Sequence, residues 1–244
     1  MKTTILSGAT GGIGTAVARR LVTAGHQVCL LGRDRQSGTT LAGELQAAGA
    51  NCQFYVCDVR DSEQIDSCIK RAHAEVGLLH SLVTAHGVLP TPTNFASTKL
   101  AAFDEAYTIN FRSTVTLMQA FMRALGEDKG VIVNIASIAG TRAFPLSAAY
   151  AASKAALIQA SKVLAQEAGE RIRVNVINPG WIRTPMTARV QQIFSIAERD
   201  AVKPYPFRRA GLPEEVAETV HWLVSDSSSF VSGAVINIDG GGLP

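Results

Sequence analysis

Two side chains that can move a proton together stand four positions apart in the second half of the chain. Tyr150 and Lys154 lie in a stretch of helical periodicity and therefore share one face of a helix. A neighbouring ammonium stabilises a tyrosinate, so we expect Lys154 to lower the pKa of Tyr150 towards neutrality. Such a tyrosine is a candidate general acid and base. Because this spacing also arises by chance, the prediction needs support from residues elsewhere.

A serine supplies part of that support. Ser137 lies just past the apolar run 131–135, which predicts a buried strand. In an open parallel sheet, the carboxyl ends of the strands form the crevice that binds ligands. A hydroxyl at that place can donate a hydrogen bond to a substrate carbonyl oxygen. The alternative is a serine that only caps a loop.

A glycine-rich run near the N-terminus indicates a nucleotide. Residues 7–14 read Ser-Gly-Ala-Thr-Gly-Gly-Ile-Gly and join an apolar strand to a helical pattern. Glycines let the backbone approach a pyrophosphate, and the following helix offers free N–H groups and the positive end of its dipole. A tight turn without a ligand is the alternative, but the strand–helix context favours a dinucleotide.

The end of the second expected strand predicts which dinucleotide is bound. An acidic residue there favours the ribose 2′-hydroxyl of NAD, whereas an arginine favours the 2′-phosphate of NADP. Gly32 stands where the acid is expected, and Arg33, whose guanidinium matches phosphate geometry, follows it. We therefore predict a preference for NADP(H) over NAD(H). Asp34 keeps open the alternative of a solvated, charged turn.

The elements that must position these residues alternate along the chain. Short β-branched runs separate longer helical patterns, which predicts a Rossmann-like, doubly wound α/β fold with a seven-stranded parallel sheet and helices on both faces. The expected strands are 5–6, 28–31, 54–56, 81–83, 131–135, 173–177 and 234–238, and the expected helices are 15–24, 40–48, 62–76, 99–125, 148–168 and 213–224. Segments 88–98 and 181–212 lack clear periodicity. No linker divides the chain, so we expect one dinucleotide-binding and catalytic domain over 1–244.

Composition excludes several classes of function. With 23 Lys and Arg against 20 Asp and Glu in 244 residues, the net charge of +3 is too balanced for binding to nucleic acid or a membrane surface. The four cysteines form no C-x-x-C pair and the five histidines no metal-ligand spacing, so we expect reduced thiols and no metal. We see no targeting segment or membrane span and expect a soluble, cytoplasmic protein.

Taken together, these features resemble the short-chain dehydrogenase/reductase family from Ser7 to Gly241. The resemblance is carried by the glycine-rich run (with Ser7 for the usual threonine), Asp58-Val59, Asn110, Ile135-Ala136-Ser137, Tyr150-Ala151-Ala152-Ser153-Lys154, Asn178-Pro179-Gly180 with Thr184, and the stretch 231–241. It implies a homotetramer and hydride transfer between a nicotinamide and a carbonyl or alcohol.

The resemblance also implies roles for individual residues. Tyr150 would exchange a proton with the substrate oxygen, Lys154 would bind the nicotinamide ribose, Ser137 would polarise the carbonyl, and Asn110 would hold a water that links Lys154 to solvent. The cofactor-binding residues that we expect are Ser7, Gly8, Thr10, Gly12, Ile13, Gly14, Arg33, Asp58, Val59, Ala85, Gly87, Tyr150, Lys154, Pro179, Gly180, Ile182 and Thr184.

One segment departs from the family pattern. After the fourth strand the family usually carries Asn-Asn-Ala-Gly, whereas residues 84–87 read Thr-Ala-His-Gly. Thr84 can still bond the backbone of a neighbouring strand. His86 either lies near the cofactor ribose or the active site, or is an ordinary packed histidine, which we favour because histidines often have structural roles.

The segment after Thr184 resembles the family's substrate loop, about residues 181–212. Its apolar residues suit a hydrophobic ketone or a 3-oxoacyl thioester; they are Met186, Val190, Ile193, Phe194, Ile196, Tyr205 and Phe207, with Phe144, Leu146 and Trp181 expected nearby. The alternative is that they only pack the segment onto the domain. Arg208 and Arg209 meet either an acidic group or solvent, and we favour solvent.

The nearest functional resemblance is to 3-oxoacyl-[acyl-carrier-protein] reductases, whose carrier is acidic. Candidates for a basic rim are Lys129, Arg171 and Arg173. A reductase of free ketones or sugar derivatives remains an alternative. So does a catalytically silent dinucleotide-binding protein that serves as a regulator or as a structural subunit of a mixed tetramer.

Overall fold

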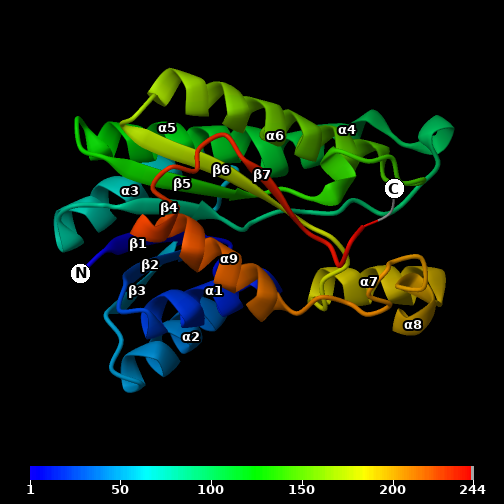
Figure 1. Cartoon of the computed structure of the whole chain (residues 1–244), viewed down its shortest axis with the longest axis horizontal. Coiled ribbons are helices and arrows are strands. Elements are labelled where there is room, and N and C mark those ends of the chain that lie inside the picture. The colour runs from blue at the N-terminus through cyan, green and yellow to red at the C-terminus, as the bar shows by residue number, and fades with distance from the viewer. Residues whose placement is uncertain (243–244) are drawn as a thin grey trace.

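Seven strands form one parallel sheet through the centre of the molecule (Figure 1). This computed structural model describes residues 1–242. The sheet order is β3-β2-β1-β4-β5-β6-β7. The strands are β1 (Thr3–Ser7), β2 (Gln27–Gly32), β3 (Cys52–Val56), β4 (Ser81–Thr84), β5 (Gly130–Ile135), β6 (Ile172–Pro179) and β7 (Val235–Ile238). The predicted doubly wound sheet is confirmed, because the order reverses direction between β1 and β4.

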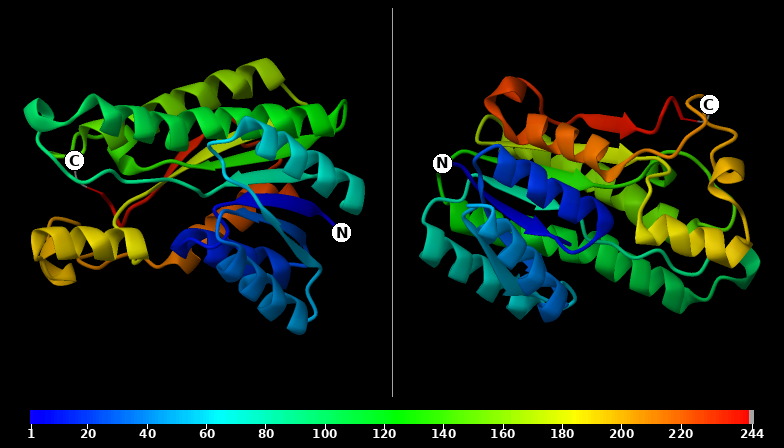
Figure 2. Two further views of the ribbon diagram at one scale, coloured as in Figure 1. Left: turned by 180° about the vertical axis from the view of Figure 1, so that it is seen from behind. Right: turned by 90° about the horizontal axis from the view of Figure 1, so that it is seen from below.

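Helices cover both faces of this sheet, as Figure 2 shows from two further sides. One layer contains α1 (Gly12–Thr23), α2 (Arg35–Ala47) and α9 (Pro213–Val224). The other contains α3 (Ser62–Val76), α5 (Ser113–Leu125) and α6 (Ala148–Ala168). Neighbouring side chains of β1 lie on opposite faces of the sheet. Ile5 packs with α3 and α5, and Leu6 packs with α1 and α9. Strands with two buried faces explain the continuous apolar runs in the sequence.

Local capping sets where several helices begin. The Asp61 side chain accepts hydrogen bonds from the backbone N–H groups of Glu63 and Gln64 at 2.9 and 3.2 Å, so α3 begins where predicted. The bounds expected for α6 and α9 are also confirmed. In contrast, α2 begins five residues before the expected start, because Asp34 caps it by accepting from Ser37 N at 3.2 Å.

The predicted single helix 99–125 is interrupted. It consists of α4 (Leu100–Ala106), a π-helical turn over Tyr107–Arg112, and α5. A π turn contains one residue more than a turn of α-helix, and such turns are frequent at functional sites. Here the turn places Asn110 at a fully buried position. Helical periodicity predicted the continuous axis but not this change of phase.

The segment 181–212 is more ordered than its sequence pattern predicted. It contains α7 (Pro185–Phe194) and the short α8 (Glu198–Ala201), which Figures 1 and 2 show beyond the end of the sheet. Thr184 caps α7 through reciprocal contacts with Thr187, and Pro185 occupies the first helical position. The Thr-Pro pair was the signal for this helix. Segment 88–98 is irregular as expected, apart from a 3-10 turn over Phe95–Ser97.

Within residues 1–242, no helix is both long and apolar enough to cross a bilayer.

Candidate functional site

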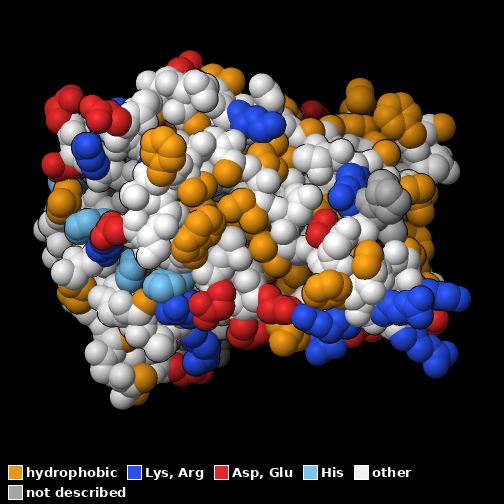
Figure 3. Space-filling view, in the orientation of Figure 1, with side chains coloured by type: hydrophobic (Ala, Val, Ile, Leu, Met, Phe, Trp, Pro, Cys, Tyr) orange, Lys and Arg blue, Asp and Glu red, His pale blue; other side chains and the backbone are white. Residues whose placement is uncertain are grey.

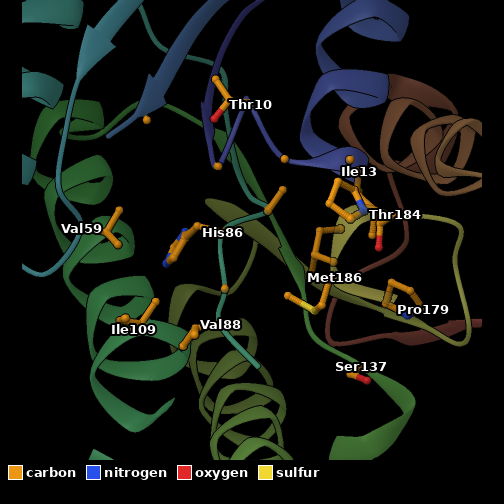
Figure 4. A pocket seen from close by; sticks show the side chains of 18 of the residues that line it. Thr10, Ile13, Val59, His86, Val88, Ile109, Ser137, Pro179, Thr184 and Met186 are labelled. Atoms are coloured by element: carbon orange, nitrogen blue, oxygen red, sulfur yellow. The ribbon is translucent and has the colours of Figure 1, made fainter. Parts of the chain in front are cut away.

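An open cleft of about 900 Å³ lies at the carboxyl ends of the strands, where Figure 4 shows its lining. Nearly all the residues predicted from the sequence line this cleft: Gly8, Thr10, Gly12, Ile13, Arg33, Asp58, Val59, Ala85, Gly87, Ser137, Tyr150, Lys154, Pro179, Gly180, Ile182 and Thr184. Ser7, Gly14 and Asn110 do not line it and lie directly behind. A doubly wound sheet binds its ligands at this edge.

The glycine-rich turn at one end of the cleft leaves no room for side chains. Gly8 has a φ of 70°, and a Cβ at that position would lie 2.5 Å from His86 N. A Cβ at Gly12 would lie 2.8 Å from Thr184 Cγ2, and one at Gly14 would overlap the Gly8 carbonyl. Because bare backbone and the N-terminus of α1 face the cleft, the turn fits the pyrophosphate of a dinucleotide.

The charged residues at the ends of β2 and β3 have distinct surroundings. Arg33 is exposed and lines the cleft. Its neighbour Asp34 accepts from Ser37 Oγ at 2.7 Å as well as from Ser37 N, so its carboxylate is engaged in capping α2. That capping removes the main objection to Arg33 as a phosphate ligand.

Arg60 is a cleft residue that the sequence analysis missed. Its Nε donates to both carboxylate oxygens of Asp58 at 3.0 Å, and this contact holds the pKa of Asp58 below its usual range. The only sequence signal was its position two residues after Asp58. A second guanidinium therefore lies at the end of the cleft that Arg33 and Val59 line.

The residues expected to do chemistry converge at the other end of the cleft. Lys154 Nζ donates to the Ile135 carbonyl at 2.9 Å and lies 5.8 Å from the centre of the Tyr150 ring. Burial raises the pKa of Tyr150, and a hydrogen bond with Ser137 acts in the opposite direction. Burial also lowers the pKa of Lys154 to about 8. In this structure burial therefore dominates the pKa of Tyr150, and the lowering that we expected from Lys154 is not observed.

Asn110 supports this region from behind the cleft. Its Nδ2 donates to the Val88 carbonyl at 3.0 Å and to Ser153 Oγ at 2.9 Å, and its Oδ1 accepts from Val88 N at 2.7 Å. A Cβ at Gly87 would lie 3.2 Å from Asn110 Oδ1 and 3.5 Å from Lys154 Nζ. The structure thus brings Asn110 and Lys154 to the same short segment after β4.

The departure from the family pattern at residues 84–87 is explained by contacts between side chains. Thr84 Oγ1 donates to Asn134 Oδ1 at 2.7 Å, so it bonds a side chain of β5 rather than the backbone that we expected. His86 is packed, as we favoured, with hydrogen bonds to Ser7 Oγ and Ser113 Oγ at 2.7 Å each. It also lines the cleft, as Figure 4 shows.

The three residues proposed from the sequence for a basic rim do not lie around the cleft. Lys129 and Arg171 precede β5 and β6, at the opposite ends of the strands. The Arg173 guanidinium is taken up by the carbonyls of Leu223, Ser225 and Val231. The prediction that these three residues form a basic rim is therefore wrong. Side chains near the starts of the strands cannot reach the carboxyl edge of the sheet.

Positive charge gathers instead on segment 181–212, as Figure 3 shows at the end of the molecule formed by α7 and α8. This segment has six Lys and Arg and two Asp and Glu, so its net charge is +4. The net charge of the whole chain is +3. Arg209 donates to both carboxylate oxygens of Glu215 at 2.6 and 2.8 Å, so it meets an acidic group, the alternative that we did not favour. Within residues 1–242, Arg189, Lys203 and Arg208 have no ion-pair partner.

The apolar residues of this segment divide between two environments. Val202 and Tyr205 are buried against Ile138, with Phe144 and Trp181 packed beside them. Other large apolar side chains of the segment are exposed; they are Met186, which lines the cleft, and Ile193, Phe194, Phe207 and Leu212. Part of the segment therefore packs onto the domain, and part is exposed. No cluster of His, Cys, Asp or Glu among residues 1–242 has the geometry to hold a metal ion.

Comparisons with known proteins agree with this geometry. The model of the family described as "Enoyl-(Acyl carrier protein) reductase" matches residues 8–242. A 3-oxoacyl-[acyl-carrier-protein] reductase from Thermotoga maritima is 32% identical over 242 residues, which cover 98% of this chain and 97% of that protein.

Two solved structures illustrate the fold. A variant of actinorhodin polyketide ketoreductase with NADPH has a TM-score of 0.94 and 29% identity, covering 98% of this chain and 96% of that one. An NAD+-bound xylitol dehydrogenase has the same TM-score with 28% identity, covering 98% of both chains. Because the two similar structures hold different dinucleotides, the fold alone does not determine the choice between them.

Proposed function

The chain belongs to the short-chain dehydrogenase/reductase family of oxidoreductases, and from this premise we propose that it is an NADP(H)-dependent enzyme that interconverts a carbonyl and an alcohol. The observation that carries the proposal is the convergence of Ser137, Tyr150 and Lys154 in one cleft with the glycine-rich turn. A bound nicotinamide supplies or accepts the hydride. All other steps belong to residues of the chain.

The proposed mechanism assigns each residue one task. The Tyr150 hydroxyl gives its proton to the substrate oxygen as the carbonyl is reduced, and takes a proton from the alcohol in reverse. Ser137 donates a hydrogen bond to the same oxygen and stabilises its developing negative charge. The Lys154 ammonium binds the nicotinamide ribose and stabilises the tyrosinate that remains, while Asn110 holds the water that connects Lys154 to solvent.

The proposed preference for NADP(H) depends on Arg33. Its guanidinium is exposed in the cleft with no carboxylate bonded to it among residues 1–242, whereas the neighbouring Asp34 carboxylate caps α2. A free guanidinium pairs with a 2′-phosphate by charge-assisted hydrogen bonds. Measured values of kcat/KM for NADPH and NADH test this directly, and a strong preference for NADH would exclude it.

The proposed substrate is a 3-oxoacyl thioester or a hydrophobic ketone. Exposed apolar side chains on segment 181–212 suit the acyl or alkyl part, and the positive excess of that segment favours a thioester on an anionic carrier. A panel of carbonyls assayed with NADPH, and of alcohols assayed with NADP+, identifies the class. Cofactor binding without turnover across the panel would instead support a catalytically silent protein.

We also propose a homotetramer. Large apolar side chains are exposed on the helices that lead to Asn110 and Lys154, namely Leu100, Tyr107 and Val163. Exposed apolar surface of this kind is typical of association sites. Native mass measurement gives the number of subunits, and a monomer at micromolar concentration would exclude the proposal.

A further inference from the structure

His86 lies at the junction of three parts of the cleft. It follows β4, its backbone abuts Gly8 of the glycine-rich turn, and its ring reaches the start of α5. Its Nδ1 lies 2.7 Å from Ser7 Oγ, and its Nε2 lies 2.7 Å from Ser113 Oγ and 3.3 Å from Thr114 Oγ1. None of the steps proposed above uses this side chain.

The hydrogen bonds around the ring determine its tautomer. The Ser113 hydroxyl donates to the Ile109 carbonyl at 2.6 Å, and the Thr114 hydroxyl donates to the Asn110 carbonyl at 3.2 Å. Both oxygens are therefore acceptors towards His86, so Nε2 carries the ring proton. Nδ1 is then the acceptor for the Ser7 hydroxyl. Both nitrogens of a neutral imidazole are satisfied by this arrangement.

The ring stays neutral at physiological pH. Burial lowers the pKa of His86 to about 3, and the nearby Lys154 ammonium acts in the same direction. A group that does not gain a proton near pH 7 is a poor proton carrier. The contacts of His86 therefore indicate a role in holding neighbouring residues in place rather than in proton transfer.

The contacts of His86 continue to the residues that do the chemistry. Ser113 and Thr114 directly follow the π turn that buries Asn110. One residue beyond Gly87, the Val88 backbone makes two hydrogen bonds with the Asn110 side chain. His86 and Val88 thus hold the π turn at two points, while Ser7 and Gly8 hold His86 to the glycine-rich turn.

We propose that His86 is a positioning residue that sets the place of Asn110 and Lys154 relative to the glycine-rich turn. The inference rests on the proposed function, because it concerns turnover in the same cleft. The turn has its own bonds, from Gly8 N to Leu31 O at 3.0 Å and from Gly11 N to Gly8 O at 3.0 Å. Loss of the imidazole therefore leaves the dinucleotide-binding turn in place but removes one of the two points at which the π turn is held.

The decisive experiment compares three variants in the full chain. In His86→Ala, we expect kcat to fall between about 10- and 100-fold, because small displacements of aligned groups have effects of this size. The dissociation constant of NADPH, measured by fluorescence titration, should stay within about threefold. His80→Ala is the matched control: His80 precedes β4 at the other end of the strand, where its Nδ1 accepts from Thr3 N at 3.0 Å. Its kcat should be unchanged within about twofold.

Two conservative variants separate positioning from simple loss of stability. The amide nitrogen of His86→Gln reaches the place of Nε2 and can still donate to Ser113, whereas His86→Asn retains only the contact with Ser7. We expect the glutamine variant to recover more of kcat than the asparagine variant. Both remain informative if His86→Ala does not fold.

Three outcomes overturn the inference. One is a folded His86→Ala protein with kcat within about twofold of the parent. The second is a parallel loss of NADPH binding and turnover, and the third is equal kcat in the glutamine and asparagine variants. Tyr150→Phe, assayed alongside, distinguishes this failure from failure of the proposed function: an active Tyr150→Phe protein refutes the proposed mechanism, whereas an inactive one with an active His86→Ala protein refutes only the role of His86.

Discussion

The floor of the cleft and the segment 181–212 beside it are built on opposite principles. In the floor and directly behind it, the polar side-chain atoms of His86 and Asn110 are all hydrogen-bonded, and the backbone around Gly8 leaves no room for a side chain. On the segment, the side chains of Arg189 and Phe207 are exposed, and within residues 1–242 the Arg189 guanidinium has no ion-pair partner. The hydrogen bonds in and behind the floor hold side chains in fixed positions, whereas the segment leaves charged and apolar side chains accessible to solvent.

This difference indicates how each region contributes to activity. Fully satisfied polar networks hold reacting groups in one arrangement, so changes there should act on kcat. Exposed charges act over longer distances and are screened by salt, so changes on the segment should act on KM and its salt dependence. Four predictions test this division, beginning with the largest expected effect.

Removal of the Tyr150 hydroxyl should have the largest effect. Tyr150→Phe should lower kcat by about 10²- to 10⁴-fold, because the proposed mechanism takes the proton for the substrate oxygen from this hydroxyl. NADPH binding, measured by fluorescence, should be unchanged. Tyr107→Phe is the control, since that ring is partly exposed on the π turn. Near-normal turnover in Tyr150→Phe would contradict the mechanism.

Arg33 tests the cofactor end of the cleft, where an exposed guanidinium should act on the choice of cofactor. Arg33→Ala should lower kcat/KM for NADPH by about 10- to 100-fold and leave the value for NADH within about twofold, because only NADPH has the 2′-phosphate. Arg35→Ala, an exposed change on α2 outside the cleft, should leave both values unchanged. Equal losses with both cofactors would show that Arg33 does not read the phosphate.

Charge reversal on segment 181–212 should act only on binding. The double variant Arg189→Glu with Lys203→Glu should raise KM for an anionic acyl thioester about 3- to 10-fold at low salt, with kcat unchanged. The effect should shrink as salt is added, and KM for a neutral ketone should not change. Lys162→Glu on α6 is the control. A fall in kcat would break the division between the two regions.

Segment 181–212 contains no histidine. We therefore expect the loss of stability at mildly acidic pH to come from histidines in the rest of the molecule. Burial lowers the pKa of His26 to about 4 and that of His86 to about 3, from 6.5. The unfolded chain therefore binds protons more tightly, so stability is full above pH 6.5 and falls as the pH drops towards 4.

Urea unfolding at pH 7 and pH 5 measures this loss, expected on the order of 1–2 kcal/mol for each histidine. His26→Gln should flatten the dependence, whereas the exposed His73→Gln should not. An unchanged slope in His26→Gln would assign the loss to other groups.

Local pattern was enough to predict most of the framework. The Tyr150–Lys154 spacing, the glycine-rich turn and the alternation of strands and helices depend on residues that are close in sequence. A helix period or a capping aspartate such as Asp61 acts within a few residues, so its effect is present in the printed sequence. Arg33 belongs here too, because its place follows from the end of a predicted strand.

Contacts between distant residues could not be predicted in the same way. Ser7 and His86 are 79 positions apart and Arg173 and Val231 are 58 apart, yet each pair is joined by a hydrogen bond. The bond from Arg209 to Glu215 is closer in sequence but depends on how α9 meets the segment before it. Such contacts depend on packing, which a local pattern does not specify.

The sequence by itself thus determined the family, the sheet and the residue types gathered at its carboxyl edge. Only the tertiary structure decided the phase of the helix around Asn110, the rise in the pKa of Tyr150, and the clustering of positive charge on segment 181–212. The physical reason is the same in each case: burial and the bonds of a polar group depend on neighbours brought together by the fold.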